Sequence, residues 1–328
     1  SATIAATALS DIGGKTSGAV TVTKAVKITG STADLTNTMV SSSSSVTAGT
    51  ALVTVSDAAF ASSSATIAAT DLSNIGGKTT GAVTLANKVR LQGSQSEVAT
   101  ALVGDSSVVA SKANTEARVT SVVNVNQGEE IAGVNNVQGI FASGLSDSLS
   151  SLASGGSSTA KLNTITGDDG DVAITVSDSA FESSSATLTA ADLSAVGGAT
   201  TGTVTVTNAI KISGNTTQLT NTLVSSSSSV TASSALVTVS DAAFTTSSAT
   251  IAATTLSDIG GKTSGTVTVT KAVKITGATA DLTNTLVSGS SLVVAGTALV
   301  TVSDAAFTTS SATIAATALS DIGGKTSG

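Results

Sequence analysis

Residues 249–276 read ATIAATTLSDIGGKTSGTVTVTKAVKIT, and this stretch decides the fold. In its second half, apolar residues alternate with Thr or Lys. The apolar residues of one parity are Val267, Val269, Val273 and Ile275. A period of two in a run rich in β-branched residues predicts a half-buried strand. Lys271 breaks the alternation at an inward position, so we expect a corner of the chain there.

The first half of the stretch has the spacing of a short helix. Ala252, Leu256 and Ile259 lie on one face at helical periodicity, and Gly260-Gly261 then gives a stop signal. The next residues repeat this order. Another helical stripe is formed by Ala278, Leu282 and Leu286, and another alternating run by Val294, Ala298, Val300 and Val302, with Gly296 as the expected corner. Because Thr and Ser are mediocre helix formers, we expect these helices to be short or partly 3₁₀.

The same order of motifs recurs along the chain. The Ile/Val-Gly-Gly motif starts at Ile12, Ile75, Val196, Ile259 and Ile322, and Phe closes a Ser-Asp-x-Ala-Phe motif at Phe60, Phe181, Phe244 and Phe307. In each series the spacings are 63 residues, except for one of 121. The chain therefore contains five repeats of about 62 residues, each made of two related halves of about 31 residues.

A strand, a corner, a second strand and a helix in about 31 residues is the size of one solenoid coil. The sequence thus predicts a parallel β-solenoid with short helical segments in each coil, an α/β-solenoid, over residues 1–328 as one continuous segment. We expect stacked strands to form continuous ladders at about 4.8 Å per step, whereas helices prefer about 8 to 10 Å. Ser1–Gly18 is identical to Ser311–Gly328, which predicts that both ends continue into a longer array.

The middle of the chain departs from this regularity. Residues 1–123 and 171–328 are regular repeats, whereas residues 124–170 form divergent repeats or an insertion. Every Glu and both Arg of the chain fall between residues 90 and 182. Two interpretations stay open, namely a decayed pair of repeats that keeps the coil count, and a decorated face that makes lateral contacts.

The composition limits the function. The chain has 328 residues, a net charge of −7, and no Cys, His, Trp, Tyr or Pro. General acid-base and nucleophilic catalysis most often use His or Cys, so we predict that the protein is not an enzyme and has no cofactor. No basic cluster indicates nucleic-acid binding. No apolar run approaches the ~20 residues that span a bilayer, so we expect no membrane span.

Four features of the sequence remain as candidate sites. Asp168, Asp169 and Asp171 lie in an Asp/Gly turn of a kind that suits Ca²⁺, although a plain polar turn explains them as well. Outward threonines would form flat hydroxyl ladders if the coils stack; they are Thr203, Thr205, Thr207, Thr266, Thr268 and Thr270. The serine runs 41–45 and 225–229 predict flexible corner loops that can carry glycans, and the Asp residues that follow each VTVS segment predict capped turns.

The motifs VTVSDAAF, ATIAATTLSDIGGKTSG, TVTVTKAVKITG and ADLTNTLV resemble the Thr/Val/Ala-rich tandem repeats of giant secreted bacterial surface proteins, notably cyanobacterial ones, grouped with adhesin-like or haemolysin-type proteins. That resemblance implies an extracellular location at the cell surface. It also implies self-association into a fibre, sheath or surface layer. The alternative is an adhesin stalk or an ice-binding solenoid that presents Thr ladders, similar to the face of solenoid antifreeze proteins.

Overall fold

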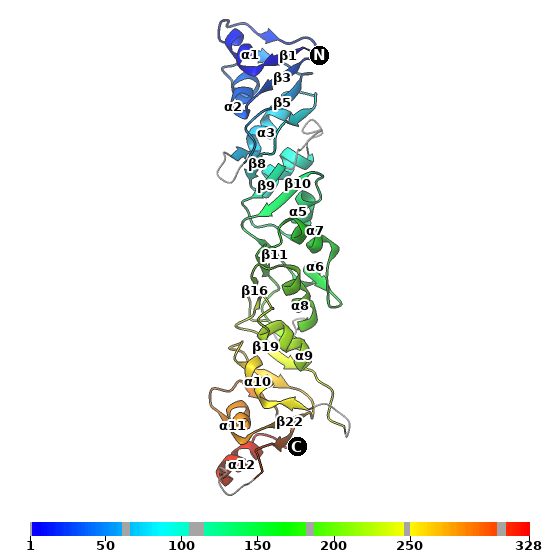
Figure 1. Ribbon diagram of the computed structural model, residues 1–328, viewed down its shortest axis with the longest axis vertical. Helices are drawn as coiled ribbons and strands as arrows, with labels where there is room; N and C mark the ends of the chain where they lie inside the picture. The colour runs from blue at the N-terminus through cyan, green and yellow to red at the C-terminus, as the bar shows by residue number, and fades with distance from the viewer. Residues whose placement is uncertain (1, 61–65, 105–114, 182–186, 246–249, 307–312) are drawn as a thin grey trace. The chain divides into compact units, whose positions relative to one another are not determined.

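The computed structural model describes residues 2–60, 66–104, 115–181, 187–245, 250–306 and 313–328. The chain divides into two compact units. Figure 1 labels helices and strands of both. Unit 1 holds Ser1–Ser146 and Ala160–Val172, and unit 2 holds Asp147–Thr159 and Ala173–Gly328. Two of the three boundaries between the units fall inside the divergent segment 124–170, and the third follows Val172; β11 (Leu145–Asp147) crosses the first.

Unit 1 combines short parallel strands with short helices. Its helices are α1 (Ala6–Gly13), α2 (Thr32–Leu35), α3 (Ala69–Gly76), α4 (Gln95–Ala99), α5 (Val125–Ala132) and α7 (Ala160–Asp168), with π-helical turns η1 (Thr36–Val40) and η2 (Thr100–Gly104). Its strands are β1 (Thr3–Ala5), β2 (Val20–Thr21), β3 (Lys27–Gly30), β4 (Val46–Thr47), β5 (Leu52–Val55), β6 (Thr66–Ala68), β7 (Val83–Leu85), β8 (Arg90–Gly93), β9 (Thr115–Val119) and β10 (Val137–Phe141).

Unit 2 repeats the scheme. Its helices are α6 (Leu149–Leu152), α8 (Ala190–Ala199), α9 (Thr216–Leu219), α10 (Ala253–Gly260), α11 (Thr279–Leu282) and α12 (Ala316–Gly323), with η3 (Thr220–Val224) and η4 (Thr283–Val287). Its strands are β12 (Ala153–Ser154), β13 (Ser157–Ser158), β14 (Ile174–Val176), β15 (Thr187–Thr189), β16 (Val204–Val206), β17 (Lys211–Gly214), β18 (Val230–Thr231), β19 (Leu236–Val239), β20 (Ile251–Ala252), β21 (Val267–Val269), β22 (Lys274–Gly277), β23 (Val293–Val294) and β24 (Leu299–Val302).

Apart from the antiparallel pair β12–β13, the paired strands run parallel, and each pairs with a strand from the next part of the chain. In unit 1 the order is β1-β3-β5-β7, and in unit 2 it is β15-β17-β19-β21-β23. Between these strands the residue number of the partner rises by 24, 25, 30 or 26, as in Thr187–Lys211, Lys211–Leu236, Val237–Val267 and Val267–Val293. The predicted α/β repeat fold is therefore confirmed, with steps shorter than the expected 31 residues.

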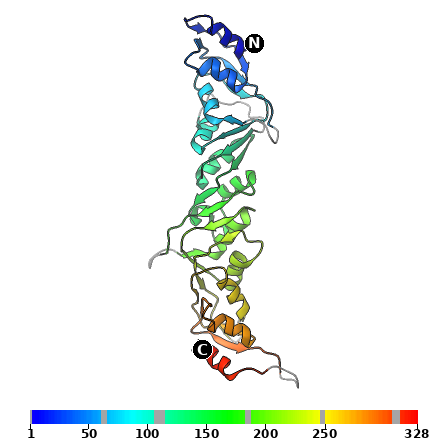
Figure 2. The same ribbon diagram turned by 90° about the vertical axis from the view of Figure 1, so that its left-hand side faces the viewer.

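The predicted continuous ladder is wrong, because the strands divide among several sheets. In unit 2 one sheet ends at β23, and β20, β22 and β24 form a separate three-stranded sheet. The helices of each unit follow one another in chain order (Figure 2), with α10 touching α9 and α11. Packed helices need about twice the spacing of paired strands, so short separate sheets relieve a mismatch that one ladder would accumulate.

The core consists of small branched side chains between the strands and the helices. Val267, Val269, Val273 and Ile275 are buried, as their parity predicts, and Lys271 is exposed between β21 and β22 as the expected corner. The inward position predicted for Val294 is wrong. It is 53% exposed, whereas Val293 is buried. The register explains this, because Val294 pairs with the outward Thr268 and Val293 with the inward Val267.

Two kinds of helix alternate along each unit. The stretches predicted around Leu256 and Leu282 are helical, but the second is a short α-helix followed by a π-helical turn, not a 3₁₀ segment. In the equivalent α9–η3 element, Asn215 and Gln218 form a capping box at the start, and the Ser225 amide bonds the Thr220 carbonyl at the end. The π-helical turn brings the Thr222 hydroxyl to the carbonyl oxygen of Ala190 in the preceding helical layer.

Candidate functional site

The outward threonines of the strands form columns across neighbouring coils. Thr205 pairs with Thr175 on one side and Thr231 on the other. Thr268 pairs with Thr238 and with Val294. Neighbouring strands lie about 4.8 Å apart, so each column repeats hydroxyl groups at that step. The structure thus brings two of the six predicted ladder residues, Thr205 and Thr268, into columns with other strands.

The other four predicted ladder residues lie at the strand ends. Thr203, Thr207, Thr266 and Thr270 are exposed, directly before or after β16 or β21. For Thr266 and Thr270, the neighbours that the hydrogen bonds define lie in the preceding coil and are not threonines. The Thr266 carbonyl accepts from the Val237 amide, and the Thr270 hydroxyl lies 3.3 Å from the Val239 carbonyl oxygen. The outward surface is therefore one Thr column wide.

A third column lies in unit 1 and was missed by the sequence reasoning. Thr29 pairs with Thr54, and Thr54 pairs with Thr84. The signal was present in the sequence, because Thr54 belongs to the repeated VTVS segment. It was missed because the sequence alone does not show that the KIT, LVTV and VTL segments lie side by side. That pairing depends on the register between coils.

Cations and aromatic rings flank the Thr columns. On the strand pair β17–β19, Ser213 pairs with Thr238, and two residues earlier Lys211 pairs with Leu236. The column next to the hydroxyl groups therefore consists of a lysine and a leucine. The Lys211 ammonium lies 5.6 Å from the centre of the Phe181 ring. Lys274 and Phe244 repeat this cation–π contact at 5.4 Å, and Arg90 and Phe60 at 3.9 Å. The outward face is therefore a mixture of hydroxyl, ammonium and apolar groups.

In the middle of the chain, most charged side chains contact other side chains of unit 1. The Arg90 Nε lies 2.5 Å from the Glu116 Oε1 on the adjacent strand. Glu97 bonds the amide and hydroxyl of Ser94, which lowers the pKa of its carboxyl group. Lys161 lies 3.2 Å from Glu129. Glu182 lies outside the described residues. These internal contacts favour a modified pair of repeats over a face of free charges.

The Asp168–Asp171 turn holds its carboxylates against backbone amides. Asp168 Oδ2 accepts from the Gly139 amide at 2.8 Å, and Asp169 Oδ2 accepts from the Phe141 amide at 2.6 Å. Burial raises the pKa of both carboxyl groups, and Asp171 contributes to the rise at Asp169. In the described part of the chain, no group of three or more potential metal ligands is close enough to hold an ion. The geometry thus favours the polar turn over the Ca²⁺ site.

The Asp residues that follow the LVTV strands bind a helix of the preceding coil. Asp57 accepts from the amide and the hydroxyl of Thr32, both at 2.7 Å. Asp241 makes the same contacts with Thr216, and Asp304 with Thr279. The prediction of a side-chain to backbone cap is confirmed for these three, but the capped amide lies 25 residues away and not in the local turn.

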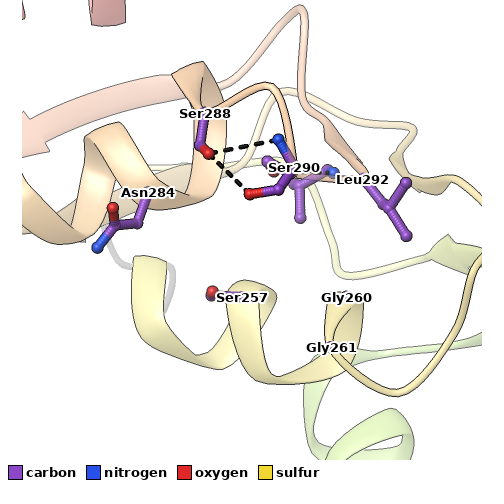
Figure 3. Close-up of a pocket in the computed structure, with 9 residues that line it drawn as sticks. Ser257, Gly260, Gly261, Asn284, Ser288, Ser290 and Leu292 are labelled. Carbon is purple, nitrogen blue, oxygen red and sulfur yellow. Dashed lines mark hydrogen bonds between the residues drawn. The ribbon is translucent and has the colours of Figure 1, made fainter.

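The serine runs 41–45 and 225–229 form hydrogen-bonded turns at corners of the chain. Figure 3 shows a similar turn, where Ser288 and Ser290 line a hollow of about 320 Å³ beside Ser257 and Gly260 of α10. The Ser291 hydroxyl donates to the Thr285 carbonyl at the end of the π-helical turn. Hollows of a second kind, lined by threonine and aliphatic side chains and by no serine, lie 63 residues apart beside Asn221 and Asn284. They are open grooves between successive helices, lined mainly by hydroxyl and aliphatic groups.

Comparison with protein-family models, curated proteins and solved structures finds no match to this chain. None of the helices in the described residues is long and apolar enough to cross a membrane.

Proposed function

We propose that this protein is a structural component of an extracellular fibre, sheath or surface layer, built by α/β-solenoid stacking of its repeats. The proposal assigns no reaction to the chain. It rests on the way in which each coil covers the apolar side of its neighbour.

The observation that carries the proposal comes from one octapeptide in two settings. ATALSDIG forms both α1 and α12. In α1, Leu9 is 5% exposed under the following coil, whereas Ile12 is 53% exposed. In α12, Ile322 is 3% exposed against the preceding coil, whereas Leu319 is 42% exposed. Each helix thus has two apolar faces, and each face is buried only where another coil lies on it.

The helices with a neighbour on both sides bury both faces. Leu72 and Ile75 of α3 are fully buried, and so are Leu256 and Ile259 of α10. Burying one such side chain contributes about 1.5 to 3 kcal/mol. A single coil therefore gains little stability alone, and the favourable way to cover its faces is to add another coil of the same kind.

The backbones of neighbouring coils approach so closely that only glycine fits at some positions. A Cβ at Gly265 would lie 2.2 Å from the Ala235 carbonyl oxygen in the preceding coil, and Gly81 meets Ala51 in the same way. The Thr263 hydroxyl also donates to this Ala235 oxygen. These recurring contacts specify one distance and one register between coils, as a periodic building material requires.

The proposed extracellular location comes from the resemblance to secreted bacterial surface repeats. The recurrent serine turns, with Ser226, Ser227 and Ser290 at their tips, are the candidate positions for glycans. In this proposal the protein binds copies of itself and no nucleic acid.

Electron microscopy of the purified chain tests the proposal. We expect uniform filaments or layers whose X-ray diffraction contains a spacing near 4.8 Å from the paired strands. The Gly265→Val variant places a branched side chain against the Ala235 carbonyl and should lose this order. Discrete particles of one chain each, at every concentration tested, would contradict assembly as the function.

The Thr columns support a second candidate, a binding solenoid such as an adhesin stalk or an ice-binding protein. The longest described column of threonines has three members, as in Thr29–Thr54–Thr84. If this face binds ice, the wild-type chain should show thermal hysteresis, and Thr54→Lys should abolish it. Equal activity of the wild type and Thr54→Lys, or none in either, would exclude the column as an ice-binding surface.

A further inference from the structure

Strand β10 lies at an edge of its sheet, and the three backbone amides that point away from β9 all have acceptors. The strand order is β10-β9-β8-β6, so β10 has a strand on one side only. On the other side, the Val137 amide donates to the Val134 carbonyl at 3.2 Å. The Gly139 and Phe141 amides donate to Asp168 and Asp169. Alternate amides along one strand are thus capped by a turn and two carboxylates.

The position of β10 in the repeat makes this cap significant. In unit 2, β21 pairs with β19 on one side and with β23 on the other. In unit 1, β10 pairs with β9 as β21 pairs with β19, but Asp168 and Asp169 occupy the side on which β21 receives β23. The carboxylate oxygens therefore replace the carbonyl oxygens of a next strand.

Helix α7 fixes the two carboxylates in this position. Leu162 and Ile165 of α7 are fully buried, and the helix packs on α5 and β10. The Asp169 amide bonds the Ile165 carbonyl oxygen at 2.9 Å, which continues the helical turn up to the cap. Asp169 is itself buried. A Cβ at Gly139 would lie 3.1 Å from the Phe141 ring of the same strand and 3.4 Å from the Asp168 carboxylate, so glycine leaves room for both side chains at the cap.

We propose that Asp168 and Asp169 are an edge cap that closes the β6–β10 sheet to a further strand, and that β10 without this cap docks β10 of a second copy. Edge strands with free amides are templates for pairing with other chains. The sequence of β10, VQGIF, carries no charge and is rich in apolar residues, as segments that pair between chains commonly are. This goes beyond the proposed function, because it concerns sideways addition of strands and holds for a chain that forms no filament.

Amide hydrogen exchange tests the cap itself. The Asp168→Ala/Asp169→Ala variant should exchange its Gly139 and Phe141 amides on the order of tenfold faster or more. The Asp168→Asn/Asp169→Asn variant keeps an acceptor oxygen at each position and should retain most of the protection. The Asp171→Ala variant removes a carboxyl group that contacts Asp169 but accepts from neither amide, and should leave both amides protected. Amides of β9 that pair with β8 report in each variant that the sheet is folded.

Disulfide trapping tests the docking. The chain has no Cys, and Ala142 is exposed directly after β10. In the Ala142→Cys background, mild oxidation should yield at least about tenfold more disulfide-linked dimer in the double-Ala variant than in the double-Asn variant or the wild type. Unchanged exchange of Gly139 and Phe141 would refute the cap. Faster exchange with no gain in dimer would refute the docking edge, whether or not filaments form.

Discussion

Two threonines in one π-helical turn of unit 2 have opposite environments. The Thr222 hydroxyl is fully buried and lies 2.7 Å from the Ala190 carbonyl oxygen and 2.8 Å from the Gln218 carbonyl oxygen. The Thr220 hydroxyl is also buried, but makes no hydrogen bond to any described residue. A buried hydroxyl contributes to stability only when it is bonded, so the first threonine stabilises the fold and the second costs stability.

Replacing each of these threonines by valine should therefore have effects of opposite sign. Valine keeps the branched shape and removes the hydroxyl. We expect Thr222→Val to lower the free energy of unfolding by about 1 to 2 kcal/mol, and Thr220→Val to leave it unchanged or raise it by up to about 1 kcal/mol. Urea unfolding of both variants against the wild type measures this. Equal losses would mean that water satisfies the Thr220 hydroxyl in the folded protein.

At this scale the sequence predicts burial well where a residue follows the strand period, and fails where burial depends on the next coil. Val267 and Ile275 are buried as predicted, but Val294 is not, because its face is set by pairing with β21. The role of Gly265 was equally hidden. Nothing in its own segment indicates that the Ala235 carbonyl lies where its side chain would be.

Among the elements, the short α-helices of the second half-repeat depend on a cap from the following strand. Asp304 accepts from the hydroxyl and the amide of Thr279, the first residue of α11. The first amides of a helix have no partner within it, so this carboxylate satisfies one of them. In the middle of the chain Ser121 takes this position and accepts from the Gln95 amide at 2.9 Å. A neutral acceptor is therefore tolerated.

This cap should make α11 sensitive to acid. The hydroxyl and the amide of Thr279 hold the pKa of Asp304 below its usual value of 3.8. A carboxyl group whose pKa is lower in the folded state stabilises the fold above the unfolded pKa, and this stabilisation is lost as the pH falls through the folded pKa. We expect the Thr279 amide to lose protection from exchange below about pH 3.8, after correction for the intrinsic rate.

Two variants separate the charge from the hydrogen bond. Asp304→Ser keeps an acceptor without a titrating group, so Thr279 protection should change little between pH 6 and pH 3. Asp304→Ala should leave the Thr279 amide poorly protected at both values. An acid-induced loss in Asp304→Ser as large as in the wild type would assign the effect to other groups.

Element types were predictable because the alternation of Val with Thr and the spacing of Leu and Ile are local patterns. The π-helical turns and the serine turns were not. Both depend on the path of the chain after the helix. After η3, the Ser228 amide donates to the Ser225 carbonyl oxygen and the Ser228 hydroxyl donates to the Thr222 carbonyl oxygen. Of the predicted site residues, Thr205 and Thr268 lie in columns as expected, whereas the position of Asp168 and Asp169 needs the fold of α7 onto β10.

For the molecule as a whole, the 63-residue spacing was the strongest signal, and it sets the packing. Each full repeat contains one helix of the ATTLSDIG kind and one α–π element of the TADLTNTLV kind, and these alternate, as α10 does between η3 and η4. The division into separate sheets could not be read from the sequence. It follows from the different spacings of helices and strands, which no single segment encodes.

Deleting one full repeat from unit 2 should therefore leave a folded protein, whereas deleting half a repeat should not. Removal of residues 203–265 joins Gly202 to Thr266, so that β14 can pair with β21 in place of β16, and β15 with β22 in place of β17. We expect unchanged circular dichroism per residue and a cooperative thermal transition. Removal of residues 203–233 instead deletes α9 and η3, so that α8 and α10, two helices of the same kind, become neighbours. This changes the strand registers and exposes faces such as that of Leu193. It should give a broad transition and dye binding to exposed apolar surface. Equal behaviour of the two deletions would show that the half-repeat, and not the 63-residue repeat, is the unit that packs.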